Sequence, residues 1–335
     1  NPRLFPEQLA YIINHAEDRI IFVDLTFIPL LEAVLPHCPT VERVVVLTDE
    51  LHMPATKLPR AECYEALLAS ASGDVQWGGF DEQTACGLCY TSGTTGNPKG
   101  VLYSHRSNFI HTLLGLQTTV LGATPKEVIL PVVPMFHANA WGIAFGGPAA
   151  GSKLVMPGAK MDGESIYELL ETESVTFSAA VPTVWQGLLA HVREKGLKFS
   201  TLKRVLIGGS AVPESLIRAF HDEYGIEVVQ GWGMTETSPI GTLSNLPPEL
   251  EALPYDEQMK WRIKQGVPPP HVELKLKNYA GQEMPHDGHT YGRLMIKGPT
   301  IAGAYFKGEG GDILDHEGFF DTGDVATIDE HGFMQ

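Results

Sequence analysis

The residues best suited to chemistry lie in one short run, Tyr90-Thr-Ser-Gly-Thr-Thr-Gly-Asn-Pro-Lys-Gly100. Glycines let backbone N–H groups approach an anion closely, hydroxyl groups add donors, and the Lys99 ammonium group supplies a compact positive charge. This composition predicts a loop that binds phosphate. The run is not a Walker A loop, because Lys99 follows a proline and Gly100 stands where that pattern needs a hydroxyl for Mg²⁺.

Short apolar runs alternate with amphipathic helical patterns up to about residue 240, and these elements must position the loop. Strands are expected at Ile20–Val23, Val41–Leu47, Gly87–Tyr90, Val128–Leu130, Lys153–Met156, Val175–Ser178, Arg204–Ile207 and Ile226–Val229. Helices are expected at Asp162–Thr172, Pro182–Glu194 and Pro213–Tyr224, among others. The alternation predicts an α/β fold of βαβ units with a largely parallel sheet, in which the loop follows a buried strand.

The pattern changes near residue 240. An acidic, proline-bearing stretch, Leu246–Gln265, includes a helical pattern over Tyr255–Ile263. Alternating strand patterns follow at Val272–Leu276 and Gly292–Ile296, separated by glycines and prolines. These features predict a smaller antiparallel sheet or barrel in the last part of the chain.

The charge balance excludes one class of partner. The 335 residues hold 24 Lys and Arg against 40 Asp and Glu, a net charge of −16. A polyanion such as DNA is repelled by such a field, so nucleic-acid binding is disfavoured. No segment approaches ~20 consecutive apolar residues, so no transmembrane segment is expected.

The cysteines indicate a compartment rather than a site. Four cysteines in 335 residues do not form a disulfide scaffold, which favours a reducing, cytoplasmic setting. Cys86 and Cys89 have the spacing of a redox or zinc half-site but no partner pair. We expect them to be buried as small hydrophobic residues of a strand, where positions three apart face opposite sides.

Other chemistries lack their motifs. The sequence has no Gly-x-Ser-x-Gly for a serine hydrolase, no His-Glu-x-x-His for a zinc enzyme, and no Gly-x-Gly-x-x-Gly after a strand for a dinucleotide fold. Three further segments carry glycine beside polar groups: Gly208–Pro213, Gly231–Glu236 and Phe319–Asp324. Taken one at a time, Glu236 is an ordinary surface carboxylate, Asp324 a turn residue and Trp232 a core residue.

Together with the loop, these segments resemble the adenylate-forming superfamily of acyl-CoA synthetases, peptide-synthetase adenylation domains and firefly-type luciferases. The four motifs occur in the family's order within residues 87–335. Within the superfamily the sequence most resembles medium- and long-chain fatty acyl-CoA synthetases, through Val133-Pro-Met-Phe-His-Ala-Asn-Ala-Trp141 and Gly231–Pro239. The resemblance implies layered αβαβα subdomains with mostly parallel sheets plus a small distorted antiparallel β-barrel.

The resemblance also implies the site residues. The implied nucleotide-binding residues are Thr91, Ser92, Gly93, Thr94, Thr95, Gly96, Lys99, Gly209, Ser210, Ala211, Gln230, Gly231, Trp232, Gly233, Thr235 and Asp324. Thr91 and Glu236 would hold Mg²⁺, and Asp324 would accept hydrogen bonds from both ribose hydroxyls. Trp232 would stack on adenine, where the family more often has Tyr. The implied catalytic residues are Lys99, Thr91, Glu236 and His137.

The implied acid site consists of His137, Ala138, Trp141, Gly209 and Gly233. His137 would flank the carboxylate, although a core histidine is an equal alternative. Trp141 matches a tunnel-gating aromatic residue of long-chain synthetases, and core packing is the alternative for it. Small residues nearby leave room for an acyl tail.

The implied reaction joins a carboxylic acid, most simply a medium- or long-chain fatty acid, to ATP with Mg²⁺ and then to coenzyme A. A short acid such as a thioether-bearing propionate, or a carrier protein in place of coenzyme A, are alternatives. A nucleotide-binding module without turnover is a third. Peripheral contact with a membrane and a homodimer are both compatible with the sequence.

The resemblance divides the chain in two. We expect the phosphate loop and the adenine and acyl sites within residues 1–240, and a small β-rich subdomain over residues 241–335 that ends at a hinge. The chain has no initiator Met, and Gln335 falls inside an expected hairpin. We therefore expect a fragment that lacks both its beginning and its C-terminal domain. In the family that domain carries an essential lysine, so we expect the fragment alone to be a poor catalyst of adenylation.

Overall fold

A computed structural model describes residues 1–91 and 96–335 of the chain. By its internal contacts the chain divides into two compact units, residues 1–84 with 90–100 and residues 85–89 with 101–335. This division lies elsewhere in the chain than the predicted boundary near residue 240, and that boundary stays a prediction.

The first unit is a small α/β layer. Its three strands pair in parallel in the order β1-β2-β3. Its elements are α1 (Pro6–Ala16), β1 (Ile20–Val23), η1 (Leu25–Phe27), α2 (Ile28–Val34), η2 (Leu35–His37), β2 (Arg43–Val46), β3 (Ala61–Cys63) and α3 (Tyr64–Ser70). Val44 and Val46 of the middle strand pack against Ile28 and Leu31 of α2, which holds this helix on the sheet.

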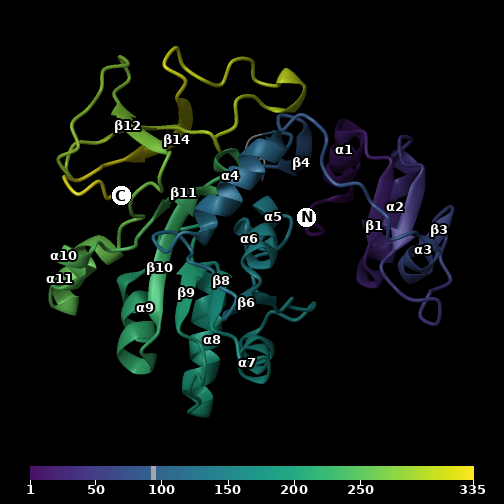
Figure 1. Cartoon of the computed structure of the whole chain (residues 1–335), viewed down its shortest axis with the longest axis horizontal. Helices are drawn as coiled ribbons and strands as arrows, with labels where there is room; N and C mark the ends of the chain where they lie inside the picture. Colours follow the sequence, from purple (N-terminus) through teal and green to yellow (C-terminus); the bar gives the residue numbers. More distant parts are fainter. Residues whose placement is uncertain (92–95) are drawn as a thin grey trace. The chain divides into compact units, whose positions relative to one another are not determined.

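A six-stranded sheet forms the centre of the second unit (Figure 1). Its order is β11-β10-β9-β8-β6-β7, and every pair is parallel except β10 with β11. The strands are β6 (Val128–Pro131), β7 (Lys153–Leu154), β8 (Phe177–Ala180), β9 (Arg204–Ile207), β10 (Glu227–Gly233) and β11 (Ile240–Leu243). The predicted strands and the α/β class, with mostly parallel pairing, are confirmed.

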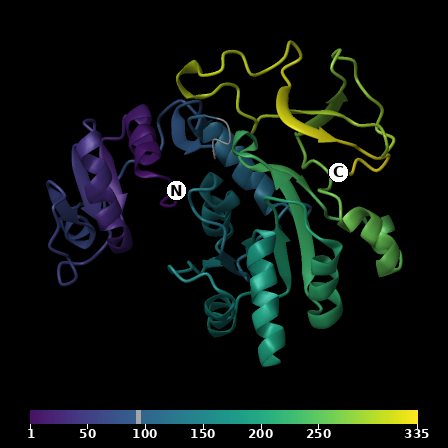
Figure 2. The same ribbon diagram turned by 180° about the vertical axis from the view of Figure 1, so that it is seen from behind.

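Helices cover both faces of this sheet. On one face, Val205 and Ile207 pack with α7 (Gly163–Thr172), α8 (Pro182–Lys195) and α9 (Glu214–Arg218), which continues as the π-turn η3 (Ala219–Glu223). These helices lie side by side in both views (Figures 1 and 2). On the other face, Leu206 packs with Ile143 of α6 (Ile143–Ala150). Alternate residues of β9 therefore serve two cores, as expected for a doubly covered sheet.

The last part of the chain adds an antiparallel sheet. Its strands pair in the order β12 (Glu273–Lys277), β13 (Gly292–Lys297) and β14 (Phe320–Ala326). The remaining elements of the unit are β4 (Ala85–Tyr90), β5 (Gly100–Ser104), α4 (His105–Leu116), α5 (Ala138–Trp141), η4 (Thr235–Thr237), α10 (Pro248–Glu251), α11 (Tyr255–Arg262) and η5 (Phe306–Gly308). The predicted antiparallel sheet is confirmed, whereas the closed barrel stays a prediction.

The expected burial of the strand before the glycine-rich loop is wrong. Cys86 is exposed, and Cys89 is only partly buried. The reason is pairing, because among the residues that the structure describes β4 pairs with β5 and not with the central sheet. Among the described residues, no helix has the length and apolar character needed to cross a membrane.

Candidate active site

A cleft of about 410 Å³ lies where the central sheet meets the antiparallel sheet. It is bordered by Gly209, Ser210, Ala211, Gly231, Trp232, Gly233, Gln265, Leu294, Asp324, Val325, Ala326, Met334 and Gln335. Residues 209–211 follow the carboxyl end of β9, where ligands bind in open α/β sheets. The structure thus brings together seven of the predicted nucleotide-binding residues, Gly209, Ser210, Ala211, Gly231, Trp232, Gly233 and Asp324.

Gln230, also predicted to bind the nucleotide, lies inside the protein. Its side chain is fully buried. The amide oxygen accepts from the backbone N–H of Val212 at 2.9 Å, and the amide nitrogen donates to the carbonyl of Lys264 at 2.7 Å. Gln230 therefore anchors the end of the loop that carries Gly209, Ser210 and Ala211.

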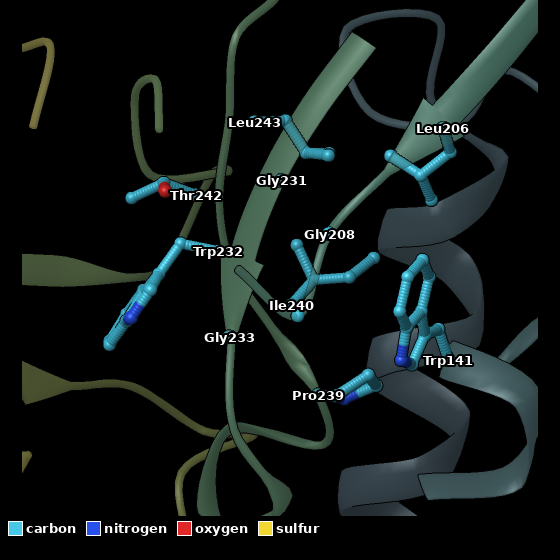
Figure 3. A pocket seen from close by; sticks show the side chains of 11 residues that line it. Trp141, Leu206, Gly208, Gly231, Trp232, Gly233, Pro239, Ile240, Thr242 and Leu243 are labelled. Carbon is cyan, nitrogen blue, oxygen red and sulfur yellow. The ribbon is translucent and has the colours of Figure 1, made fainter. Parts of the chain in front are cut away.

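A second, apolar pocket of about 70 Å³ lies on the opposite face of the β10–β11 ladder. Its lining consists of Trp141, Leu206, Gly208, Gly209, Gly231, Trp232, Gly233, Pro239, Ile240, Thr242 and Leu243. In Figure 3, Ile240 and Leu243 point toward the side of Trp141, whereas the side chains of Trp232 and Thr242 point the other way. Of the predicted acid-site residues, Trp141, Gly209 and Gly233 line this pocket.

Trp141 is held by an unusual turn. Ala138, Asn139, Ala140 and Trp141 all have positive φ, between 41° and 57°, so α5 is a single left-handed turn. This conformation costs an L-residue roughly 1–2 kcal/mol, and such strain is concentrated at functional sites. The indole lies against Gly208, where an added Cβ would stand 3.3 Å from the ring.

The other predicted acid-site residues flank this turn. Ala138 is buried, whereas His137 is exposed and its ring lies tilted by 53° to that of Phe136, with ring centroids 4.7 Å apart. The backbone carbonyl of His137 accepts from the N–H of Trp141 at 3.2 Å. Neither side chain is among those that line the apolar pocket.

A further, much smaller apolar space of about 10 Å³ lies behind Trp141, which lines both spaces. Its walls include Gly115, Gly142, Ile143, Gly146 and Phe177, together with His111. His111 is almost completely buried, and its Nε2 accepts from the backbone N–H of Ile240 at 3.3 Å. This bond requires an unprotonated Nε2, and burial lowers the pKa of His111 to about 4.

Glu236, the predicted metal ligand, is buried in η4. Its Oε1 accepts from the hydroxyl of Tyr305 at 2.5 Å, and its backbone carbonyl accepts from the N–H of Ala302 at 2.8 Å. The preceding carbonyl, of Thr235, accepts from the hydroxyl of Tyr103 at 2.7 Å. Burial and the carboxylate of Glu236 raise the pKa of Tyr305, so this phenol stays a donor.

Sequence reasoning did not find Tyr305, Tyr103 or His111. Each stands outside the motifs, and each contacts a residue far along the chain, as with the 69 positions that separate Tyr305 from Glu236. The sequence offered one signal for them, which is a tyrosine or histidine inside an apolar segment. All three act on backbone or side chains of the predicted site.

The glycine-rich loop belongs to the other compact unit. The N–H of Thr91 donates to the carbonyl of Lys99 at 2.9 Å, and the N–H of Lys99 donates to the hydroxyl of Thr91 at 3.1 Å. These two bonds close the base of the loop, and Lys99 and Gly96 are exposed. The predicted phosphate ligands Ser92, Gly93, Thr94 and Thr95 lie outside the described residues.

Comparison with known proteins agrees with this arrangement. The sequence model of the AMP-binding enzyme family matches residues 1–306, so the chain belongs to that family.

Its relatives include a 3-methylmercaptopropionyl-CoA ligase of Ruegeria pomeroyi, 47% identical over 334 residues, and a medium-chain-fatty-acid–CoA ligase of Ectopseudomonas oleovorans, 45% identical over 334 residues. All of this chain aligns with 62% and 61% of these proteins, so it spans less than two thirds of their length.

Solved structures share the fold. A long-chain-fatty-acid–CoA ligase from Archaeoglobus fulgidus matches with a TM-score of 0.83 and 27% identity, over the whole of this chain and 65% of the other. An anthranilate CoA ligase solved with anthranoyl-AMP matches with a TM-score of 0.86 over the whole of this chain and 61% of the other. At 22% identity, the second match shows the fold alone.

The neutral state of His111 gives a prediction on stability. The unfolded chain takes up a proton near the ordinary histidine pKa of 6.5, whereas the folded chain does so only near about 4. The contribution of neutral His111 to the free energy of unfolding is therefore fully present above about pH 6.5 and is lost as the pH drops toward about 4. In His111→Gln the amide oxygen can still accept from the N–H of Ile240, but the side chain does not titrate. We predict that the decrease in the free energy of unfolding between about pH 7 and pH 5 is smaller in this variant by on the order of 2 kcal/mol.

Urea unfolding at both pH values measures this difference. His286→Gln, at an exposed position, controls for the loss of a histidine. An unchanged pH dependence in His111→Gln would contradict the assignment.

Proposed function

We propose that this chain is the acid- and nucleotide-binding part of an AMP-forming acyl-CoA ligase. The observation that carries the proposal is the β10–β11 ladder, with an apolar pocket on one face and a polar cleft on the other. Gly231 and Gly233 line both spaces. An apolar tail and a nucleotide bound on the two faces would meet at these glycines, where no side chain separates them.

The reaction follows from such a meeting. An oxygen of the acid's carboxylate attacks the α-phosphorus of ATP, and the bond to the leaving pyrophosphate breaks. The thiolate of coenzyme A then attacks the carbonyl carbon of the acyl-adenylate, and AMP leaves. Since acid and ATP are both anions, the protein's task is to hold them in line and to neutralise charge.

We assign the phosphates to the glycine-rich loop, on its composition, with Lys99 as the positive charge. His137 would then act near the carboxylate, as the resemblance implies. The cleft would hold adenine and ribose against Gly209, Ser210, Ala211, Trp232 and Asp324, while Thr235 donates to the α-phosphate. Backbone amides and one lysine can bind a polyanion locally whatever the net charge of −16.

Glu236 and Thr91 have the oxygen ligands that Mg²⁺ prefers, and when bound the ion would offset charge on the phosphates. Within residues 1–91 and 96–335, no group of three His, Cys, Asp or Glu side chains could hold a metal by itself. This fits an ion that takes most of its ligands from nucleotide and water. The hydroxyl of Tyr305 fixes one oxygen of Glu236, which orients the carboxylate.

The acid would have an aliphatic tail that ends at Trp141. With the indole in place, we assign a short thioether acid or a medium-chain acid to the apolar pocket, because both kinds of acid appear in the names of the relatives. A long chain would need the space behind Trp141. Coenzyme A as acceptor and a cytoplasmic location complete the proposal.

The direct experiment measures ATP binding to this chain by calorimetry, with and without Mg²⁺, and acyl-CoA formation by the complete protein across acids of increasing length. We expect Glu236→Gln, which keeps the acceptor for Tyr305, to lose the Mg²⁺-dependent part of ATP binding and at least about 100-fold in adenylation. Glu249→Gln, at an exposed position, serves as the matched control.

Three outcomes contradict parts of this proposal. Full activity in Glu236→Gln would mean that the metal assignment is wrong. Transfer of the acyl group to a carrier protein and not to free coenzyme A would replace the ligase by a carrier-loading enzyme. If this chain released pyrophosphate at the rate of the complete protein, the expectation that adenylation needs the C-terminal domain would be refuted.

Trp141→Ala tests the assignment of the acyl pocket. Removing the indole joins two apolar spaces, so we predict that kcat/KM shifts toward longer acids by about tenfold or more, since each methylene is worth about 1–3 kcal/mol in an apolar pocket. The acid panel on the complete protein measures the shift. Trp77→Ala, which removes an exposed indole, is the control, and an unchanged length profile would place the tail elsewhere.

A further inference from the structure

We propose that Trp232 determines specificity for the ribose as well as for the base, because its indole N–H positions the carboxylate of Asp324. The inference rests on the proposed nucleotide site. Nε1 of Trp232 donates to Oδ2 of Asp324 at 3.0 Å, although the two residues are 92 positions apart. A stacking surface needs no such bond, so the geometry gives the indole a second task.

The indole is fixed on the side of the ladder that carries the cleft. Trp232 pairs with Thr242, and the register shifts directly after it, between Trp232 and Gly233. An added Cβ on Gly241 would stand 2.3 Å from Cζ3 of the ring, so only glycine there lets the indole lie against the strand. The ring also packs on the hydrophobic clusters of the antiparallel sheet, beside Leu274.

Asp324 has no such support of its own. It is exposed in β14, and its backbone N–H donates to the hydroxyl of Thr322 at 3.1 Å. Within the part of the chain that the structure describes, its carboxylate has only the bond from Trp232, which leaves Oδ1 as an acceptor beside the cleft. An exposed carboxylate without that bond would sample several rotamers, and fixing one of them upon binding would weaken the affinity.

Indole chemistry makes the two tasks separable. Tryptophan has a flat face and one donor, whereas phenylalanine has the face without the donor. A tyrosine would carry its donor at a different distance from the ring. Trp232→Phe therefore keeps the surface for adenine and removes the bond to Asp324.

Calorimetry on this chain compares ATP with 2′,3′-dideoxy-ATP, which lacks both ribose hydroxyls. We expect the unaltered chain to prefer ATP by on the order of tenfold, as for hydrogen bonds to a charged acceptor. In Trp232→Phe this preference should fall by about three- to tenfold, while the affinity for 2′,3′-dideoxy-ATP stays within about twofold. Asp324→Asn should reduce the same preference, and the double variant should add little to either single one.

Four different results would overturn the inference or its basis. Equal weakening of both nucleotides in Trp232→Phe would mean that the indole only stacks. An unchanged preference in that variant would mean that Asp324 needs no support. A chain that binds ATP without any preference over the dideoxy form would remove Asp324 from the ribose site, and no ATP binding at all would refute the proposed function itself.

A second measurement does not depend on the folding of Trp232→Phe. The chain has five tryptophans, so its indole N–H groups give five resolvable NMR signals. Asp324→Asn changes an exposed side chain and should shift one indole signal, because the charged acceptor is lost. If all five signals stay in place, the hydrogen bond is absent and the inference fails.

Discussion

The alternation of side chains across the β10–β11 ladder is the constraint on which the site depends. Successive residues of a strand face opposite sides, so Trp232 and Thr242 face away from Leu243. The register shift after Trp232 places Ile240 on the side of Leu243 as well. One strand pair thereby forms the wall of an apolar pocket and of a polar cleft. Glycine at 231 and 233 keeps this wall free of side chains where the two spaces approach each other.

The elements around the ladder hold each side in place by buried polar bonds. Gln230 anchors the loop beyond β9, His111 holds the start of β11 through Ile240, and Tyr305 holds Glu236. A buried polar group that loses its partner costs about 1–3 kcal/mol, so these bonds fix the geometry. The left-handed turn that ends at Trp141 stores strain on the apolar side, which is consistent with a functional position.

Much of the fold followed from local pattern. Arg204–Ile207 is a strand at the predicted bounds, because a short apolar run between helices leaves few alternatives. The exposure of Cys86 could not be predicted, since the separation of β4 and β5 from the central sheet is not a local property of the sequence. Motifs indicated Trp232 and Asp324, but their hydrogen bond joins distant segments. Tyr305 had no motif at all, so only the folded chain reveals it.

The central claim is that the two faces of one ladder serve a single acyl-adenylate. Calorimetry on this chain with a non-hydrolysable octanoyl-adenylate mimic, AMP and octanoate tests it most directly. Because the mimic joins both halves, we expect it to bind at least about 100-fold more tightly than AMP. A mimic that binds no more tightly than AMP would contradict the account, since the apolar pocket would then contribute nothing to the nucleotide site.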